Sequence, residues 1–251
     1  MLKHFLSPPN WFTSASIFCG FYAIMLAAGN DGDPTTFYQA GLLIGFAGVF
    51  DMLDGRVARM TNSQSEFGVQ LDSLADVVSF GIAPAVLVYN WGLDSLGIVG
   101  LAAAFLFVIC GIFRLARFNV GTTNQEEFER SRGLTITMAG GTLAAMVMFH
   151  AAMGLTFVKH PTGPLTAIIV MALLMVSSVP FRTTKGLRMG RATKATAAVL
   201  FASLIVCGVF YDISFIVLPV MVLYAASGPV EALLGRRTRR RAARAHKDDR
   251  G

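Results

Sequence analysis

Residues 51–59 read DMLDGRVAR and residues 68–76 read GVQLDSLAD. These two segments carry four carboxylates within a largely apolar region, and the four are Asp51, Asp54, Asp72 and Asp76. The first pair is three residues apart and the second pair four apart, so that in helices each pair projects from a single face. If the two faces meet, they form an oxygen-rich pocket.

Acids placed at the ends of apolar helices need compensating charge. An ionised carboxylate costs about 3 kcal/mol at the centre of a membrane helix on insertion scales. Divalent cations would supply the compensation, because Mg²⁺ and Mn²⁺ prefer carboxylate and phosphate oxygens. Mg²⁺ in particular is usually held by a few carboxylates together with the phosphates of a substrate. The ligand type therefore predicts a phosphorylated substrate.

The composition is that of a membrane protein. Of 251 residues, 54% are hydrophobic and 14% are charged, whereas soluble domains carry about 25% charged residues. At about 20 apolar residues per span, we expect helices near residues 11–29, 36–57, 69–91, 96–117, 134–156, 164–180, 195–210 and 213–231. The expected fold is all-α, a polytopic bundle of about eight transmembrane helices. We expect one membrane domain over residues 1–235 and a basic tail over residues 236–251.

The charge distribution predicts the orientation. Basic residues gather at alternate ends of the expected spans, and the opposite loops carry mainly acids and turn formers. By the positive-inside rule, both termini and the four aspartates are cytoplasmic. The basic tail could bind nucleic acid, but no fold that reads bases precedes it. Contact with anionic lipid headgroups is the favoured interpretation, with no nucleic-acid partner.

Other common site types are disfavoured. The three cysteines lie in apolar blocks without CxxC spacing, which argues against a disulfide framework or a thiolate metal site. None of the four histidines lies within helical spacing of the aspartates. The first apolar stretch lacks the small-residue cleavage site of a signal peptide, so we expect it to remain as a span.

Small residues accompany the acids, at Gly55, Ala58 and Gly68. Small residues commonly let membrane helices pack closely, and they can equally admit a substrate to the helix surface. Their position beside four carboxylates favours substrate access.

The complete pattern D-x2-D-G-x2-A-R-x8-G-x3-D-x3-D resembles the signature of the CDP-alcohol phosphatidyltransferase family, with every fixed position present. The resemblance implies a homodimeric membrane enzyme that transfers a phosphatidyl group from CDP-diacylglycerol directly to an alcohol. It implies two divalent ions, Mg²⁺ or Mn²⁺, among the four aspartates, with Asp76 as the general base. The residues that it implies for binding CDP and substrate are Asp54, Gly55, Ala58, Arg59, Ser65, Gly68 and Asp72.

Three further segments resemble the bacterial and archaeal phosphatidylserine synthase branch, namely residues 65–85, 113–119 and 175–185. This branch implies L-serine as the acceptor and a prokaryotic cytoplasmic membrane as the location. One departure is visible, because residues 133–137 read GLTIT where the branch has a Gly-Leu-Pro segment. Glycerol 3-phosphate, inositol phosphate and choline therefore stay open as alternative acceptors.

Polar groups near the cytoplasmic ends of later spans are candidates for the acceptor site. Arg114, Arg117 and Asn119 end the fourth expected span, and Lys185 follows the sixth. They could anchor helix orientation, or they could bind a serine carboxylate or lipid phosphate, for which arginine is well suited. A cation-coupled transporter and a non-catalytic scaffold are the rival classes. The position of all four acids at the same ends of two consecutive helices favours the enzyme.

Overall fold

The computed structural model describes residues 8–30, 32–61, 65–123, 133–155, 158, 160–179 and 212–229, without the side chains of residues 121–123. Every regular element in these ranges is helical, which confirms the predicted all-α class. In chain order they are α2 (Pro8–Ala28), α3 (Pro34–Met60), α4 (Glu66–Asp76), the π-helix η1 (Val77–Ile82), α5 (Ala83–Val88), the π-helix η2 (Tyr89–Leu93), the 3-10 helix η3 (Asp94–Leu96), α6 (Ile98–Thr123), α8 (Ile136–Ala152), α9 (Thr162–Val176) and a helix over Ser214–Pro229.

Several helices have the length and composition of membrane spans. Four stretches suffice by these criteria, Pro8–Ala28, Pro34–Met60, Glu66–Leu96 and Ile98–Val120. Three shorter apolar helices follow, Ile136–Ala152, Thr162–Val176 and Ser214–Pro229. The expected span at residues 195–210 lies outside the described residues. Large apolar side chains such as Trp11, Phe18 and Phe105 are exposed, as expected for surfaces that face lipid rather than water. The chain is thus a polytopic membrane helical protein.

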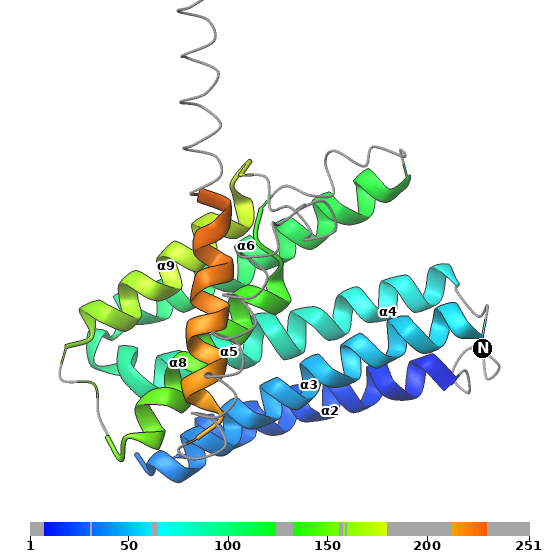
Figure 1. The fold of residues 1–251 in the computed structure, drawn as a ribbon. Coiled ribbons are helices and arrows are strands. Elements are labelled where there is room, and N and C mark those ends of the chain that lie inside the picture. The colour runs from blue at the N-terminus through cyan, green and yellow to red at the C-terminus, as the bar shows by residue number, and fades with distance from the viewer. Residues whose placement is uncertain are drawn as a thin grey trace, which may run out of the picture.

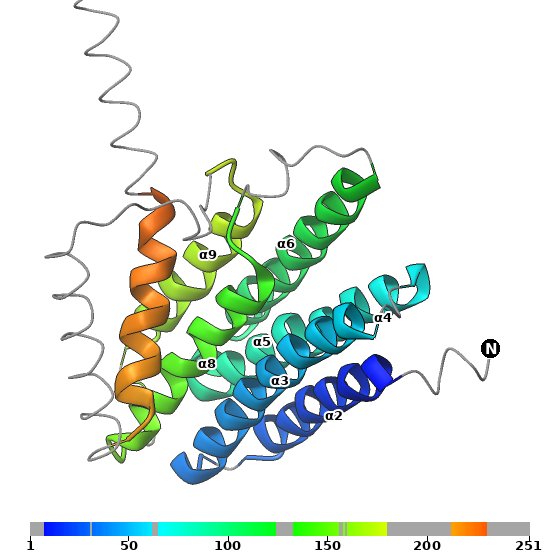
Figure 2. The ribbon, with the colours of Figure 1, turned by 45° about the vertical axis from the view of Figure 1, so that its right-hand side comes forward.

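The helices pack as a row of neighbours. Contacts join α2 to α3, α3 to α8 and α6 to α9, and Figures 1 and 2 show these pairs side by side. The helix over Ser214–Pro229 joins this row through Phe215, whose ring lies 4.8 Å from that of Phe149 on α8. Just before this helix begins, the Asp212 carboxylate accepts a 2.9 Å hydrogen bond from the Tyr38 hydroxyl of α3.

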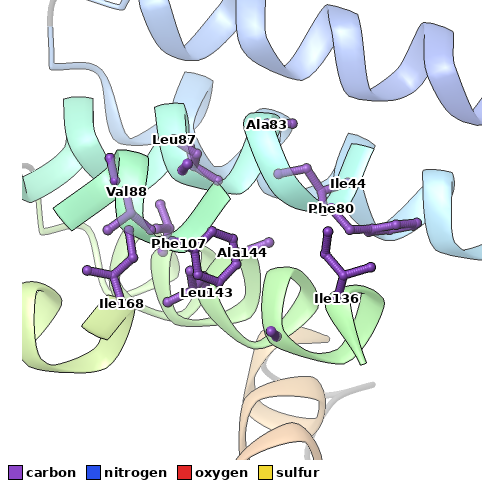
Figure 3. Close-up of a cluster of buried hydrophobic side chains, with 14 of the residues drawn as sticks. Ile44, Phe80, Ala83, Leu87, Val88, Phe107, Ile136, Leu143, Ala144 and Ile168 are labelled. Atoms are coloured by element: carbon purple, nitrogen blue, oxygen red, sulfur yellow. The ribbon is translucent and has the colours of Figure 1, made fainter. Parts of the chain in front are cut away.

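The hydrophobic core lies where α3, α5, α6, α8 and α9 meet. Figure 3 shows its buried side chains, which include Ile44, Phe80, Phe107, Leu143 and Ile168. Each of these five side chains is at most 2% exposed. The tight packing of this apolar core holds the helices in register.

Side-chain caps determine where α3 and α4 begin. Asp33 accepts a hydrogen bond from the backbone N–H of Thr35 at 3.0 Å, and Pro34 occupies the first helical turn. Ser65 accepts from the backbone N–H of Gly68 at 3.1 Å. These bonds satisfy amides that a helix leaves unpaired at its start. They set the start of the two helices that carry the aspartates.

Candidate active site

The acidic region lies at the end of the bundle where α2 begins, α3 ends and α4 begins (Figure 1). Asp51 is nine residues before the last residue of α3, and Asp76 is ten residues after the first residue of α4. At 1.5 Å per residue, both lie about 15 Å along their helices from this end. The last turns of α3 and the first turns of α4 therefore extend beyond the acids.

Three carboxylates from two helices come together. One oxygen from each of Asp51, Asp72 and Asp76 lies within 4.8 Å of the others. Asp76 Oδ1 is buried and has no hydrogen-bond partner among the described residues. Negative groups this close repel one another, and an orphaned buried oxygen is costly. An all-oxygen donor set with an unsatisfied atom fits a hard divalent cation, so these residues could hold a metal.

Asp54 lies beside this cluster and has a different partner. It is 6% exposed, and its Oδ2 accepts a 2.8 Å hydrogen bond from the Thr13 hydroxyl of α2. The same hydroxyl lies 3.2 Å from the carbonyl oxygen of Pro9. The bond fixes the direction of the Asp54 carboxylate and ties the first helix to the acidic site.

A pocket of about 230 Å³ opens next to the cluster. Its lining includes all seven residues that the family resemblance implies for CDP and substrate binding, Asp54, Gly55, Ala58, Arg59, Ser65, Gly68 and Asp72. A Cβ added at Gly55 would meet nothing within 4 Å, so the backbone is open there. At Gly68 it would lie 3.3 Å from Ser65 Oγ, against the cap of α4.

The other lining residues were not predicted. Pro9, Asn10 and Thr13 come from α2, and Val69 comes from α4. Asn10 and Thr13 are 7% and 4% exposed, which is unusual for polar residues on an apolar helix. The sequence offered one indication of their role, since Asn10 and Thr13 are polar and lie three positions apart at the start of an apolar stretch. It does not say which helix they face.

The candidate acceptor residues occupy different places. Arg114 lies near enough to Asp76 to interact with it electrostatically, and its guanidinium is 5.1 Å from the centre of the Phe118 ring. Arg117 donates to the carbonyl oxygens of Met175 and Val176, both at 3.4 Å, at the end of α9. Asn119 donates to Ser73 Oγ at 3.0 Å. Lys185 and the basic tail lie outside the described residues.

Comparison with known proteins agrees with this geometry. Residues 6–179 match the family described as CDP-alcohol phosphatidyltransferase. The chain belongs to this family. It is 36% identical over 179 residues to the CDP-diacylglycerol–serine O-phosphatidyltransferase of Helicobacter pylori, covering 69% of this chain and 70% of that protein. It is 33% identical over 196 residues to the archaetidylserine synthase of Methanothermobacter thermautotrophicus, covering 76% of each. It is 32% identical over 174 residues to the CDP-diacylglycerol–serine O-phosphatidyltransferase of Bacillus subtilis, covering 69% of this chain and 88% of that protein.

As a CDP-alcohol phosphatidyltransferase, the chain is a multi-pass membrane enzyme. Its pocket of about 230 Å³ has room for part of a substrate. The adjoining carboxylates suit cations that also bind phosphate oxygens. The two features share Asp72, which lines the pocket and belongs to the acidic cluster.

Proposed function

We propose that this CDP-alcohol phosphatidyltransferase transfers the phosphatidyl group of CDP-diacylglycerol to L-serine and releases CMP. The observation that carries the proposal is that six residues of the motif, together with Ser65, line one pocket, which adjoins three clustered carboxylates. Serine as the acceptor is supported by relatives named CDP-diacylglycerol–serine O-phosphatidyltransferase or archaetidylserine synthase, whose matches cover about 70% of the chain.

The acidic residues have distinct proposed tasks. Asp51, Asp72 and Asp76 would hold divalent metal, with Asp54 facing the pocket at their side. Two Mg²⁺ or Mn²⁺ ions would neutralise negative charge on the diphosphate as CMP leaves. Arg59, which lines the same pocket, adds a fixed positive charge for phosphate oxygens. The open backbone at Gly55 leaves room for the cytidine to approach α3.

Asp76 would act as the general base. In the proposed step the serine hydroxyl oxygen forms a bond to the phosphorus of the phosphatidyl group. The bond between that phosphorus and the CMP oxygen breaks, and the hydroxyl proton passes to Asp76. The supporting observation is the unsatisfied oxygen of Asp76, which has no partner among the described residues and is free to accept a proton.

Arg114 is the strongest of the candidate acceptor residues. Its electrostatic proximity to Asp76 supports a site where a serine carboxylate is bound beside the base. Arg117, Asn119 and Lys185 stay proposed for the acceptor or the lipid phosphate. For Arg117 the bonds to the α9 carbonyls also support a purely structural use.

We further propose the arrangement in the membrane. Both termini and the pocket face the cytoplasm of a prokaryotic cell, as the distribution of basic residues supports. The membrane domain ends near residue 235 and a basic tail follows. A homodimer is proposed from the family resemblance.

The test is acceptor competition. Purified protein in mixed micelles is given CDP-diacylglycerol with serine, glycerol 3-phosphate, inositol phosphate or choline, with and without EDTA, and CMP and lipid products are measured. We expect CMP and phosphatidylserine only with serine and a divalent metal. A lipid product from another alcohol and none from serine would refute the acceptor. CMP release that survives complete metal removal would refute the metal-assisted reaction.

A further inference from the structure

The helix that carries Asp72 and Asp76 changes its winding directly after Asp76. Residues Val77–Ile82 form the π-helix η1, in which the N–H of Ala83 bonds to the carbonyl oxygen of Val78, five residues earlier. Such turns are rare and each inserts one residue into the helical repeat. One residue corresponds to about 100° of rotation. The position of the π-turn therefore decides which way the acidic half of the helix faces relative to the half in the core.

The π-turn is bonded to α2 through Ser79. This residue is 0% exposed, and its hydroxyl donates to the backbone carbonyl oxygen of Ser16 at 3.0 Å. The Ser16 hydroxyl lies 3.4 Å from Ser79 Oγ and donates to it. A buried helical hydroxyl commonly bonds within its own helix, as Thr142 does with Met138. Ser79 instead bonds to a neighbouring helix.

Two glycines on neighbouring helices bring those helices against the π-turn. A Cβ at Gly20 of α2 would lie 2.7 Å from both Cα and Oγ of Ser79. A Cβ at Gly140 of α8 would meet the carbonyl oxygen of Phe80, and it would lie 3.0 Å from Phe80 Cα. Backbone thus approaches backbone on two sides of the turn. The π-turn is therefore closely packed between α2 and α8.

We propose that Ser79 is a positioning residue for the metal centre: its bond to Ser16 fixes the π-turn and thereby directs Asp76 toward Asp51 and Asp72. The inference rests on the proposed function only in assuming that these carboxylates bind metal. Ser79 is not part of the pocket lining or the acidic cluster, so it acts through Asp76. The pocket residues lie before Asp76 in the chain, and binding of the CDP-lipid should depend little on Ser79.

The test compares two perturbations of the π-turn with matched controls. Ser79→Ala removes the interhelical hydroxyl, and Thr142→Val removes a buried hydroxyl that bonds within its own helix. Gly20→Ala adds a methyl group against Ser79, and Gly45→Ala adds one where nothing lies within 4 Å. Mn²⁺ binding to each purified protein without substrate is measured from the electron paramagnetic resonance signal of free Mn²⁺. Thermal unfolding is measured in parallel.

We expect Ser79→Ala and Gly20→Ala to bind Mn²⁺ about tenfold or more weakly, as is usual when support for metal ligands is removed. Thr142→Val and Gly45→Ala should bind as wild type does. In turnover at saturating Mn²⁺, where the metal site of each protein is filled, Ser79→Ala should lower kcat and leave KM for CDP-diacylglycerol within about twofold, because the pocket lining is unchanged.

Several outcomes would overturn the proposal. A merely structural role would lower the unfolding temperatures of Ser79→Ala and Thr142→Val alike and leave both with wild-type Mn²⁺ affinity. If wild type binds Mn²⁺ and Ser79→Ala binds it equally well, Ser79 has no positioning role, and the proposed function stays intact. Wild-type protein that binds no Mn²⁺ would overturn both. If Gly20→Ala fails to fold, Ser79→Ala alone decides the matter, since it only deletes one oxygen atom.

Discussion

The hydrogen bond between Thr13 and Asp54 offers a quantitative test of the role of the first helix. Thr13→Val removes the hydroxyl and keeps the shape of the side chain. Asp54 would lose its 2.8 Å bond in a place where it is only 6% exposed, so water cannot easily replace the donor. A hydrogen bond to a charged group contributes about 1.5–3 kcal/mol. We therefore expect kcat/KM for CDP-diacylglycerol to fall by about 10- to 150-fold.

The assay is the initial rate of CMP release in mixed micelles over a range of CDP-diacylglycerol at saturating serine. Thr13→Ser keeps a hydroxyl and should recover most of the activity. Thr142→Val is the matched control, because it deletes a buried hydroxyl whose bond to Met138 stays within α8. If Thr13→Val stays within about twofold of wild type, or if Thr142→Val is equally impaired, the bond does not serve the site.

Three further predictions concern separate parts of the molecule. Asp76→Asn should lower kcat by at least about 100-fold, as for loss of a general base. At saturating divalent metal it should keep metal-dependent binding of CDP-diacylglycerol, and binding lost even there would contradict the base role. Gly140→Ala should lower the free energy of unfolding by about 1–3 kcal/mol, because the added methyl group meets Phe80. Gly45→Ala is the control and should leave this free energy unchanged. Both are measured by denaturation in detergent. The pKa of Asp33 is lowered, mainly by the backbone N–H of Thr35. The ionised Asp33 carboxylate therefore contributes its whole stabilisation when the pH is above the usual pKa of 3.8. This stabilisation is lost as the pH falls through the lowered pKa of the folded protein. The unfolding temperature of wild type should fall over this acid range, whereas that of Asp33→Asn should not fall for this reason. Equal acid sensitivity of the two proteins would contradict the prediction.

The acidic motif could be predicted because its signal is local. Spacing alone places each aspartate pair on one helix face, and a connection of a few residues between the two helices brings the faces together. The membrane class followed from long apolar blocks, which need no knowledge of the partner helices. In the described part of the chain the expected spans correspond to helices, with ends that differ by several residues where caps such as Asp33 and Ser65 act.

Other features depended on tertiary contacts that the sequence does not specify. Thr13 was expected only as part of the apolar span 11–29, and Asn10 lay just before that span. Their place in the pocket could not be predicted, because it requires that α2 begins beside the start of α4. The π-turn at Val77–Ile82 contains no proline, and none of its residue types specifies a π-turn. Its winding is tied to contacts with Gly20 and Gly140, which lie far away in the chain. For Arg117 the sequence left open a helix anchor or an acceptor ligand, and its bonds to the carbonyls of α9 could be seen only once that helix was placed.

The pocket and the acidic cluster have one more consequence, which concerns synthesis and divergence. All their residues lie between Pro9 and Asp76, on three helices that are consecutive in the chain. The residues proposed to bind nucleotide and metal are therefore synthesised before α8, the helix that packs against the π-turn following Asp76. The candidate acceptor residues Arg114, Arg117 and Asn119 come later, on α6, so that the proposed choice of headgroup and the proposed metal chemistry are encoded in separate parts of the chain.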